Sequence, residues 1–110
     1  MKLAVGSDEQ TPVTDAVVAE LRRRGHEVDL RGLLRPLRSD GGHDATTWPA
    51  VARQGGGGVA GGAADEGILF CWTGTGVSMA ANKVPGVRAA LCDDAETARG
   101  ARLWNNANVL

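Results

Sequence analysis

The sequence predicts an α/β protein, with a doubly wound parallel sheet of about five strands in a three-layer α/β/α arrangement. Short apolar runs alternate with segments whose apolar residues recur every three or four positions along the 110 residues. Strands that alternate with helices imply right-handed crossovers and therefore a parallel sheet. The length fits a single domain, 1–110. In such a domain we expect the functional site beyond the carboxyl ends of the strands.

The first part of the chain predicts a strand, a helix and a second strand. The apolar run 3–5 predicts the first strand. Thr11 can cap a helix that has Pro12 at its first position, and the apolar residues of its next turns share one face. Gly25 is in the usual place to end this helix. The alternating segment 27–30 then predicts a half-exposed second strand.

The middle of the chain predicts irregular structure around one short helix. Residues 31–46 are rich in Gly, Arg and Asp, which indicates a loop. Thr46 or Thr47 can cap a short helix that continues to Ala52. Each glycine in a helix costs about 1 kcal/mol relative to alanine. We therefore expect the glycine-rich stretch 55–62 to be a loose loop or a poorly formed helix.

The second part of the chain predicts three more strands and two more helices. The segment 67–71 is the clearest buried strand, and a glycine-rich turn and a helix over 77–84 follow it. Residues 87–92 predict a fourth strand, and Asp94 can cap a helix that runs to about Leu103. The segment that begins at residue 108 predicts a fifth strand. The order of these elements is typical of a Rossmann-like fold.

Composition excludes several classes of function. The formal net charge is −1, so there is no basic surface for nucleic acid or anionic lipid. No stretch approaches the roughly 18 apolar residues that a membrane span needs. The N-terminus leads directly into a predicted strand, which favours a cytoplasmic protein. The two cysteines and two histidines are not at metal-ligand spacing. We expect a small-molecule substrate, no metal and no cofactor.

The segment 67–84 has the pattern of a reactive site. Its strand places Cys71 at the edge of the sheet, and Gly74 and Gly76 allow backbone to approach a ligand closely. The helix beginning near Val77 directs unpaired N–H groups to the same place, where one donor to an oxyanion can contribute about 3 kcal/mol. The same positive end favours the thiolate of Cys71, which could remove a proton next to a carbonyl. Two plainer interpretations stay open: Cys71 as a small core residue, and the glycines as a turn or a phosphate-binding loop.

Three motifs resemble those of the ribose-5-phosphate isomerase B and LacAB sugar-phosphate isomerases. Residues 67–90, GILFCWTGTGVSMAANKVPGVRAA, are similar to the family signature G-I-L-x-C-G-T-G-x-G-x-x-x-A-A-N-K-x-x-G-x-R-A-A. Residues 6–8 resemble the opening G-S-D, and residues 105–110 resemble N-N-A-N-V-L. The motifs occur in the family's order and extend over nearly the whole chain, which makes the match specific.

The resemblance implies a role for each matching residue. Cys71 would be the base that moves a proton between C1 and C2 of an open-chain sugar, and Val77 stands where cysteine-free members have a glutamate. The loop from Thr73 to Gly76 would stabilise the enediolate, and Asp8 and Asn105 would contact sugar oxygens. The expected catalytic residues are Cys71, Thr73 and Asp8. The expected substrate-binding residues are Gly74, Thr75, Gly76, Val77, Ser78, Asn105, Glu9, Trp48, Trp72 and Trp104.

Four positions depart from the family pattern. Glu9 replaces a histidine, Trp48 a substrate-facing tyrosine, Trp72 a glycine and Trp104 the histidine that helps to open the sugar ring. The family also continues past the last motif, with arginines that bind phosphate and helices that build the dimer. We therefore expect proton transfer to persist and ring opening and phosphate binding to be altered. Arg88 and Arg99 are candidate substitutes for those arginines, with structural roles as the alternative.

Three functional hypotheses follow. The first is an aldose–ketose isomerase of the usual kind, with a homodimer completing the site as in the family. The second is a repurposed enzyme, such as a tautomerase, epimerase or cyclase, that acts on a non-phosphorylated, more apolar carbonyl compound in a tryptophan-walled pocket. The third is a catalytically silent binding protein, in which the tryptophans only repack the surface.

Overall fold

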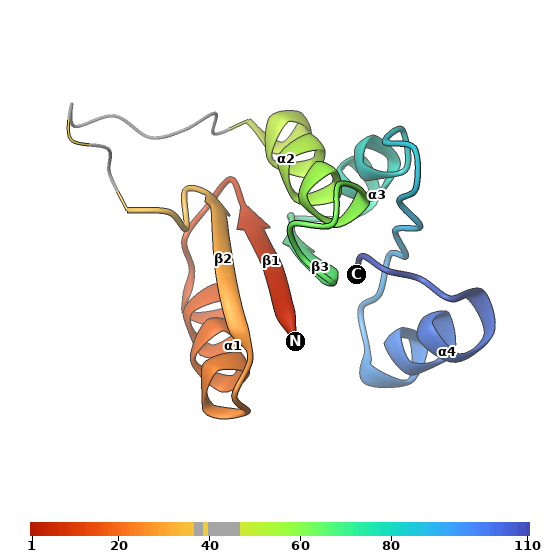
Figure 1. The fold of residues 1–110 in the computed structure, drawn as a ribbon, viewed down its shortest axis with the longest axis horizontal. Helices are drawn as coiled ribbons and strands as arrows, with labels where there is room; N and C mark the ends of the chain where they lie inside the picture. The colour runs from red at the N-terminus through yellow and green to blue at the C-terminus, as the bar shows by residue number, and fades with distance from the viewer. Residues whose placement is uncertain (37–38, 40–46) are drawn as a thin grey trace.

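The sheet of this computed structural model consists of three parallel strands. The structure describes residues 1–36, 39 and 47–110, so most of the predicted loop 31–46 and the candidate cap Thr46 lie outside the described residues. The strands are β1 (Lys2–Ser7), β2 (Glu27–Gly32) and β3 (Glu66–Phe70), in the order β2-β1-β3 (Figure 1). The α/β class and the parallel sheet predicted from the sequence are confirmed.

The predicted number of five strands is wrong. The segments 87–92 and 108–110 form only isolated parallel bridges, Gly67 with Val109 and Ala89 with Val109. For the segment 87–92, the reason lies in two asparagine side chains. Asn82 donates to the Ala89 carbonyl at 2.9 Å and accepts from the Ala89 N–H at 2.8 Å, and Asn108 accepts from the Arg88 N–H at 2.7 Å. These side chains occupy backbone groups that a longer ladder would pair.

Helix α1 (Pro12–Arg23) begins where the sequence predicts. Thr11 is its N-cap, and its side chain accepts from the Thr14 N–H at 3.2 Å while the Thr14 hydroxyl accepts from the Thr11 N–H at 2.9 Å. This reciprocal pair satisfies two amides that helix geometry would otherwise leave unpaired. Val18 of α1 packs with Leu3 and Val5 of β1. Helix α1 therefore covers one face of the sheet.

Helix α2 (Trp48–Ala60) is regular through residues 55–60, so the predicted loose loop or poorly formed helix is wrong there, while 61–62 form the turn that follows. Gly55 and Gly56 are buried, and a Cβ there would lie 2.7 Å from Leu69 and 3.1 Å from Val87 respectively. The missing side chains let the helix pack closely on β3 and the segment after α3. Tertiary contact thus outweighs the poor helix propensity of glycine.

Helices α3 (Thr75–Ala81) and α4 (Ala95–Asn105) complete the fold. Helix α3 begins and ends earlier than predicted, and α4 extends slightly beyond Leu103. The Asp94 carboxylate accepts from the Thr97 N–H at 2.6 Å, which confirms the predicted cap. Ala52 of α2 and Ala81 of α3 share a core cluster with Ala4 of β1, whose neighbours Leu3 and Val5 face α1. Helices therefore cover both faces of the sheet (Figure 1).

No described helix is both long enough and apolar enough to cross a membrane.

Candidate active site

The carboxyl edge of the sheet lies where β1 and β3 end side by side. Ser7 pairs with Phe70 in the last register position, so Asp8 and Cys71 begin their loops at the same edge. Cys71 is a half-buried free thiol. It lines two cavities, one on each side of the Cys71–Trp72 segment.

The larger cavity has a volume of about 570 Å³ and lies between β3, α3 and the start of α4. Both apolar and polar residues line it. The lining residues from β3 and α3 include Phe70, Cys71, Trp72, Thr73, Gly74, Val77 and Ser78, and those around α4 include Leu91, Cys92, Asp93, Asp94 and Ala98. The smaller cavity, of about 270 Å³, adds Asp8 and Glu9 from the loop after β1.

The glycine loop before α3 has a backbone that requires glycine at one position. Gly74 has φ 78°, in the left-handed region, and a Cβ there would meet Leu91 at 2.2 Å. The Thr73 and Thr75 hydroxyls lie 2.8 Å apart, and the Thr75 N–H donates to the Thr73 hydroxyl at 3.4 Å. Amides of the first helical turn that follow have no partner within the helix. Of the residues in this loop and turn, Thr73, Gly74, Val77 and Ser78 line the larger cavity.

Trp48 borders the same loop from helix α2. A Cβ on Gly76 would lie 3.1 Å from two atoms of the Trp48 ring. The indole therefore lies against the first turn of α3, and it stays 42% exposed. Gly76 is the position at which the helix accommodates this ring.

Trp72 and Glu9 meet across the edge of the sheet. The Trp72 Nε1–H donates to Glu9 Oε2 at 2.9 Å, and the Glu9 N–H donates to the Ser7 hydroxyl at 3.1 Å. Trp72 is 89% exposed although it is a large aromatic residue. Its ring lines both cavities.

Trp104 and Asn105 lie at the opposite edge of the sheet. Helix α4 begins at the larger cavity and runs back, so that Arg102 near its end forms an ion pair with Glu66 at the start of β3. Trp104 packs over Gly100, where a Cβ would meet its ring at 2.8 Å. One chain therefore brings together the predicted residues Asp8, Glu9, Trp48 and 71–78, but not Trp104 and Asn105.

Four residues of the larger cavity, Leu91, Cys92, Asp93 and Asp94, were missed by the sequence analysis. The available signal was topological, because the predicted strand 87–92 ends at the same edge as the strand that precedes Cys71. Burial raises the pKa of the Cys92 thiol, and the carboxylates of Asp94 and Asp93 raise it further. Cys92 is therefore a protonated thiol at neutral pH.

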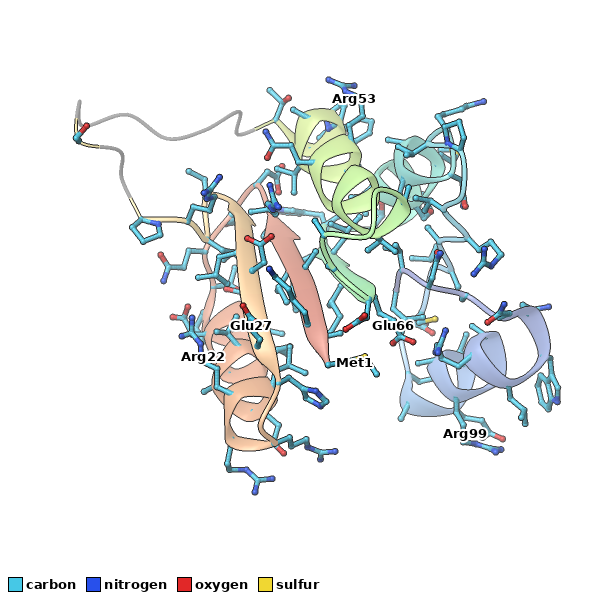
Figure 2. All side chains as sticks on the ribbon, viewed as in Figure 1. Met1, Arg22, Glu27, Arg53, Glu66 and Arg99 are labelled. Atoms are coloured by element: carbon cyan, nitrogen blue, oxygen red, sulfur yellow. The ribbon has the colours of Figure 1, made fainter. Side chains whose placement is uncertain are left out.

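The two arginines suggested as phosphate ligands lie elsewhere. The Arg88 guanidinium donates to the Asn106 carbonyl at 2.6 Å, which supports a structural role. Arg99 projects from α4 away from the sheet (Figure 2). No lysine or arginine is among the described residues that line the two cavities. The described part of the chain also contains no group of three or more His, Cys, Asp or Glu residues placed to hold a metal ion.

Fold and site together define an α/β protein with a thiol and a glycine loop at the carboxyl edge of a parallel sheet. A family model described as Ribose/Galactose Isomerase matches residues 3–110. The chain therefore belongs to the ribose/galactose isomerase family, as the three sequence motifs predict.

Individual relatives agree with this assignment. The chain is 43% identical over 94 residues to ribose-5-phosphate isomerase B of Escherichia coli, covering 86% of this chain and 58% of the relative. It is 38% identical over 111 aligned positions to the galactose-6-phosphate isomerase subunit LacB of Clostridium acetobutylicum, covering 100% of this chain and 60% of the relative. The chain thus spans about three-fifths of the length of these relatives.

A solved structure supports the same fold. Ribose-5-phosphate isomerase B of Clostridium thermocellum superposes with a TM-score of 0.83 at 36% identity, covering 100% of this chain and 70% of that one.

Proposed function

We propose that this chain acts as an isomerase of the family type, in which Cys71 transfers a proton between two carbons, one of which starts as the carbonyl carbon. The observation that supports this most is the position of Cys71. It lies at the end of β3, in a cavity whose rim includes the glycine loop and the first turn of α3. A base and a group of oxyanion donors then face the same space.

The reaction follows from this placement. Cys71, as its thiolate, removes the proton from the carbon next to the substrate carbonyl. The carbonyl oxygen becomes the oxyanion of an enediolate, which the backbone amides after Gly74 and the Thr73 hydroxyl stabilise. The thiol returns the proton to the former carbonyl carbon, and the proton of the adjacent hydroxyl moves to the enediolate oxygen. Asp8 orients a substrate hydroxyl from the neighbouring loop.

A non-phosphorylated, more apolar carbonyl substrate is the second candidate for this site. Two indoles border the glycine loop, Trp48 and Trp72. Asp8 and Glu9 place carboxylates on one side of Cys71, and like charge disfavours a phosphate there. This arrangement is the observation that supports the second candidate, a tautomerase, epimerase or cyclase of a flat or apolar compound.

Proton exchange tests the role of Cys71 whatever the product of the reaction is. Hydrogen–deuterium exchange next to the carbonyl is followed by NMR for ribose 5-phosphate, D-ribose and 2-hydroxyacetophenone. On the compound that exchanges fastest, C71S should lower the rate at least about 100-fold, the typical effect of losing a positioned base. The matched control C92S removes the other thiol of the same cavity and should keep most of the rate.

The outcomes separate the three hypotheses. Exchange in C71S equal to that of the wild type would exclude Cys71 as the base. Rapid, Cys71-dependent turnover of ribose 5-phosphate would favour the ordinary isomerase over the repurposed enzyme. If the wild type exchanges none of the compounds, the silent binding protein becomes the better interpretation.

We also propose that residues 1–110 act as one domain and that a second copy completes the site. Both core clusters pack on the same sheet, which supports a single domain. Asn105 lies at the edge opposite Cys71, so a site that uses both residues needs Cys71 of one copy and Asn105 of another.

Complementation between variants tests the shared site. C71S and N105A should each be inactive, and mixing them should restore part of the turnover, because one heterodimer site then contains both native residues. Light scattering should show a dimer. A monomer at high micromolar concentration, or a mixture as inactive as its components, would contradict this proposal.

A further inference from the structure

The contact between Glu9 and Trp72 joins two loops that end neighbouring strands. Each residue lies two positions beyond the pair Ser7 and Phe70, the last register position of β1 and β3. The two side chains therefore start from the same edge of the sheet and meet at 2.9 Å, Nε1 of the indole to Oε2 of the carboxylate. Hydrogen bonds to a charged acceptor are stronger than neutral ones.

This hydrogen bond orients a ring that packing does not hold. Trp72 is 89% exposed, so few neighbours restrict its side chain. The backbone of Glu9 is held in place, because its N–H donates to the hydroxyl of Ser7, which is only 2% exposed. The buried end of β1 thus anchors the residue whose carboxylate accepts from the indole of Trp72.

Trp72 follows Cys71 directly along the chain, and both residues line the two cavities. The exposed indole offers a stacking surface at the cavities that contain this thiol. Asp8 and Glu9 add carboxylates to the smaller cavity on the same side. A flat, uncharged group gains from the ring, whereas an anionic group meets repulsion from the carboxylates.

We propose that Trp72 is a specificity-determining residue and that Glu9 is a positioning residue that acts through it. Together they select a carbonyl compound that bears a flat or apolar group and disfavour one with an anionic group near Cys71. This inference rests on the proposed function for the kind of compound that enters the site. It adds the pair of side chains that chooses among such compounds.

Alkylation of Cys71 measures this selection without turnover. The probes are 2-bromoacetophenone, which is flat and neutral, iodoacetamide, which is small and neutral, and iodoacetate, which is small and anionic. Rates at the Cys71 peptide are followed by mass spectrometry and divided by those of N-acetylcysteine, which corrects for the reagents' own reactivity. The Cys92 peptide serves as the internal control.

Trp72 variants test the stacking surface. W72A should lower the ratio of 2-bromoacetophenone to iodoacetamide rates about three- to tenfold, in line with the range of measured aromatic pair energies. W72F keeps a ring without the N–H donor and should lower the ratio less. A ratio in W72A equal to that of the wild type would overturn the role of Trp72.

Glu9 variants separate positioning from charge. E9Q keeps an oxygen acceptor for the indole, so its ratio for the two neutral reagents should match the wild type while its iodoacetate rate rises. E9A removes the acceptor and should lower the ratio to about the level of W72F. Equal ratios in E9Q and E9A would overturn the positioning role, and an unchanged iodoacetate rate in E9Q would overturn the selection against anions.

The alkylation ratios test the specificity inference independently of the experiment on the proposed function. If Cys71 proves not to be the base, the alkylation ratios still report on Trp72 and Glu9. If the ratios do not change while C71S abolishes proton exchange, only the specificity inference fails. Failure of all three reagents to reach Cys71 would overturn the inference, because the site would not admit such compounds.

Discussion

The two edges of the sheet use their polar groups differently. At the carboxyl edge, Cys71 and Trp72 line both cavities, and residues of the glycine loop and the first turn of α3 line the larger one. At the opposite edge, Arg102 binds Glu66 and the Ala107 carbonyl, and Arg88 binds the Asn106 carbonyl. The carboxyl edge is therefore available for a ligand, while the opposite edge holds the last residues of the chain against β3.

The asparagines of residues 105–110 also differ in how their polar groups are used. Asn108 accepts from the Arg88 N–H and donates to the Gly86 carbonyl, so it is a structural residue. Asn106 has φ 50°, in the left-handed region that asparagine tolerates, and ends α4. Asn105, the last residue of α4, is exposed, and it is the asparagine to which the proposed shared site assigns a role.

The substitution with the largest expected effect on stability is G74A, at the carboxyl edge of the sheet. G74A adds a Cβ at φ 78° and 2.2 Å from Leu91, so it combines backbone strain with overpacking. We expect a loss of about 3 kcal/mol in the free energy of unfolding, measured by denaturant titration. G62A is the matched control, because Gly62 has φ 80° but open space around it, and it should cost only about 1 kcal/mol.

The double variant G74A/L91A sharpens this prediction. Truncating Leu91 removes the atoms that the new Cβ would meet, so part of the loss should be recovered. A loss in G74A no larger than in G62A would contradict the account of the contact between Gly74 and Leu91.

A substitution at the opposite edge, R102A, should have a smaller effect on the free energy of unfolding. R102A removes the pair with Glu66 and the hydrogen bond to the Ala107 carbonyl. Because Arg102 and Glu66 are partly exposed, we expect a loss of about 1 kcal/mol in the free energy of unfolding. R99A on the outer side of α4 is the control and should change stability little. Equal losses in R102A and R99A would argue against the pairing at this edge.

The smallest expected effect on stability comes from Asp94 at the start of α4. Protonation of its carboxylate in acid should lower the free energy of unfolding. The Thr97 backbone N–H, followed by the Thr97 side chain, lowers the pKa of Asp94 below its ordinary value of 3.8. A lowered pKa in the folded state means that this contribution is complete above the unfolded pKa. It is lost as the pH falls through the lower folded pKa.

Variants of Asp94 isolate this contribution. D94A should be less stable than the wild type at neutral pH, and the difference should shrink as the pH falls below about 4. D94N keeps an acceptor for the Thr97 N–H without titrating, so its stability should depend less on acid. Thermal unfolding at a series of pH values measures both, and a constant difference between wild type and D94A would exclude Asp94 as the titrating cap.

Local signals were sufficient to predict several elements from the sequence. Thr11 with Pro12 marked the start of α1, and Asp94 marked the start of α4, because a cap acts on amides within the same turn. Apolar runs located β1 and β3, and the alternation of residues 27–30 located β2, because these patterns also lie in neighbouring residues. The glycine turn after β3 was also visible, because its residues are adjacent along the chain.

Only the tertiary structure decided the features that depend on distant partners. The glycines of α2 are helical because Gly55 and Gly56 pack against Leu69 and Val87. The predicted fourth strand is reduced to a bridge because asparagine side chains occupy the backbone groups of Arg88 and Ala89. The hydrogen bond between Glu9 and Trp72 joins residues 63 positions apart, so no local pattern could indicate it.

The sequence by itself determined the family, the α/β class and the strand, thiol and glycine loop that form the candidate site, because motifs and periodicity are written in neighbouring residues. The tertiary structure decided which side chains share the space around Cys71. It placed Trp72, Glu9 and Asp94 near this thiol and Asn105 at the other edge. The physical reason is that parallel strands end at one edge of the sheet, so the loops that follow them meet there although they are distant along the chain. Helix α4 starts at this edge, and its last residues lie at the opposite edge.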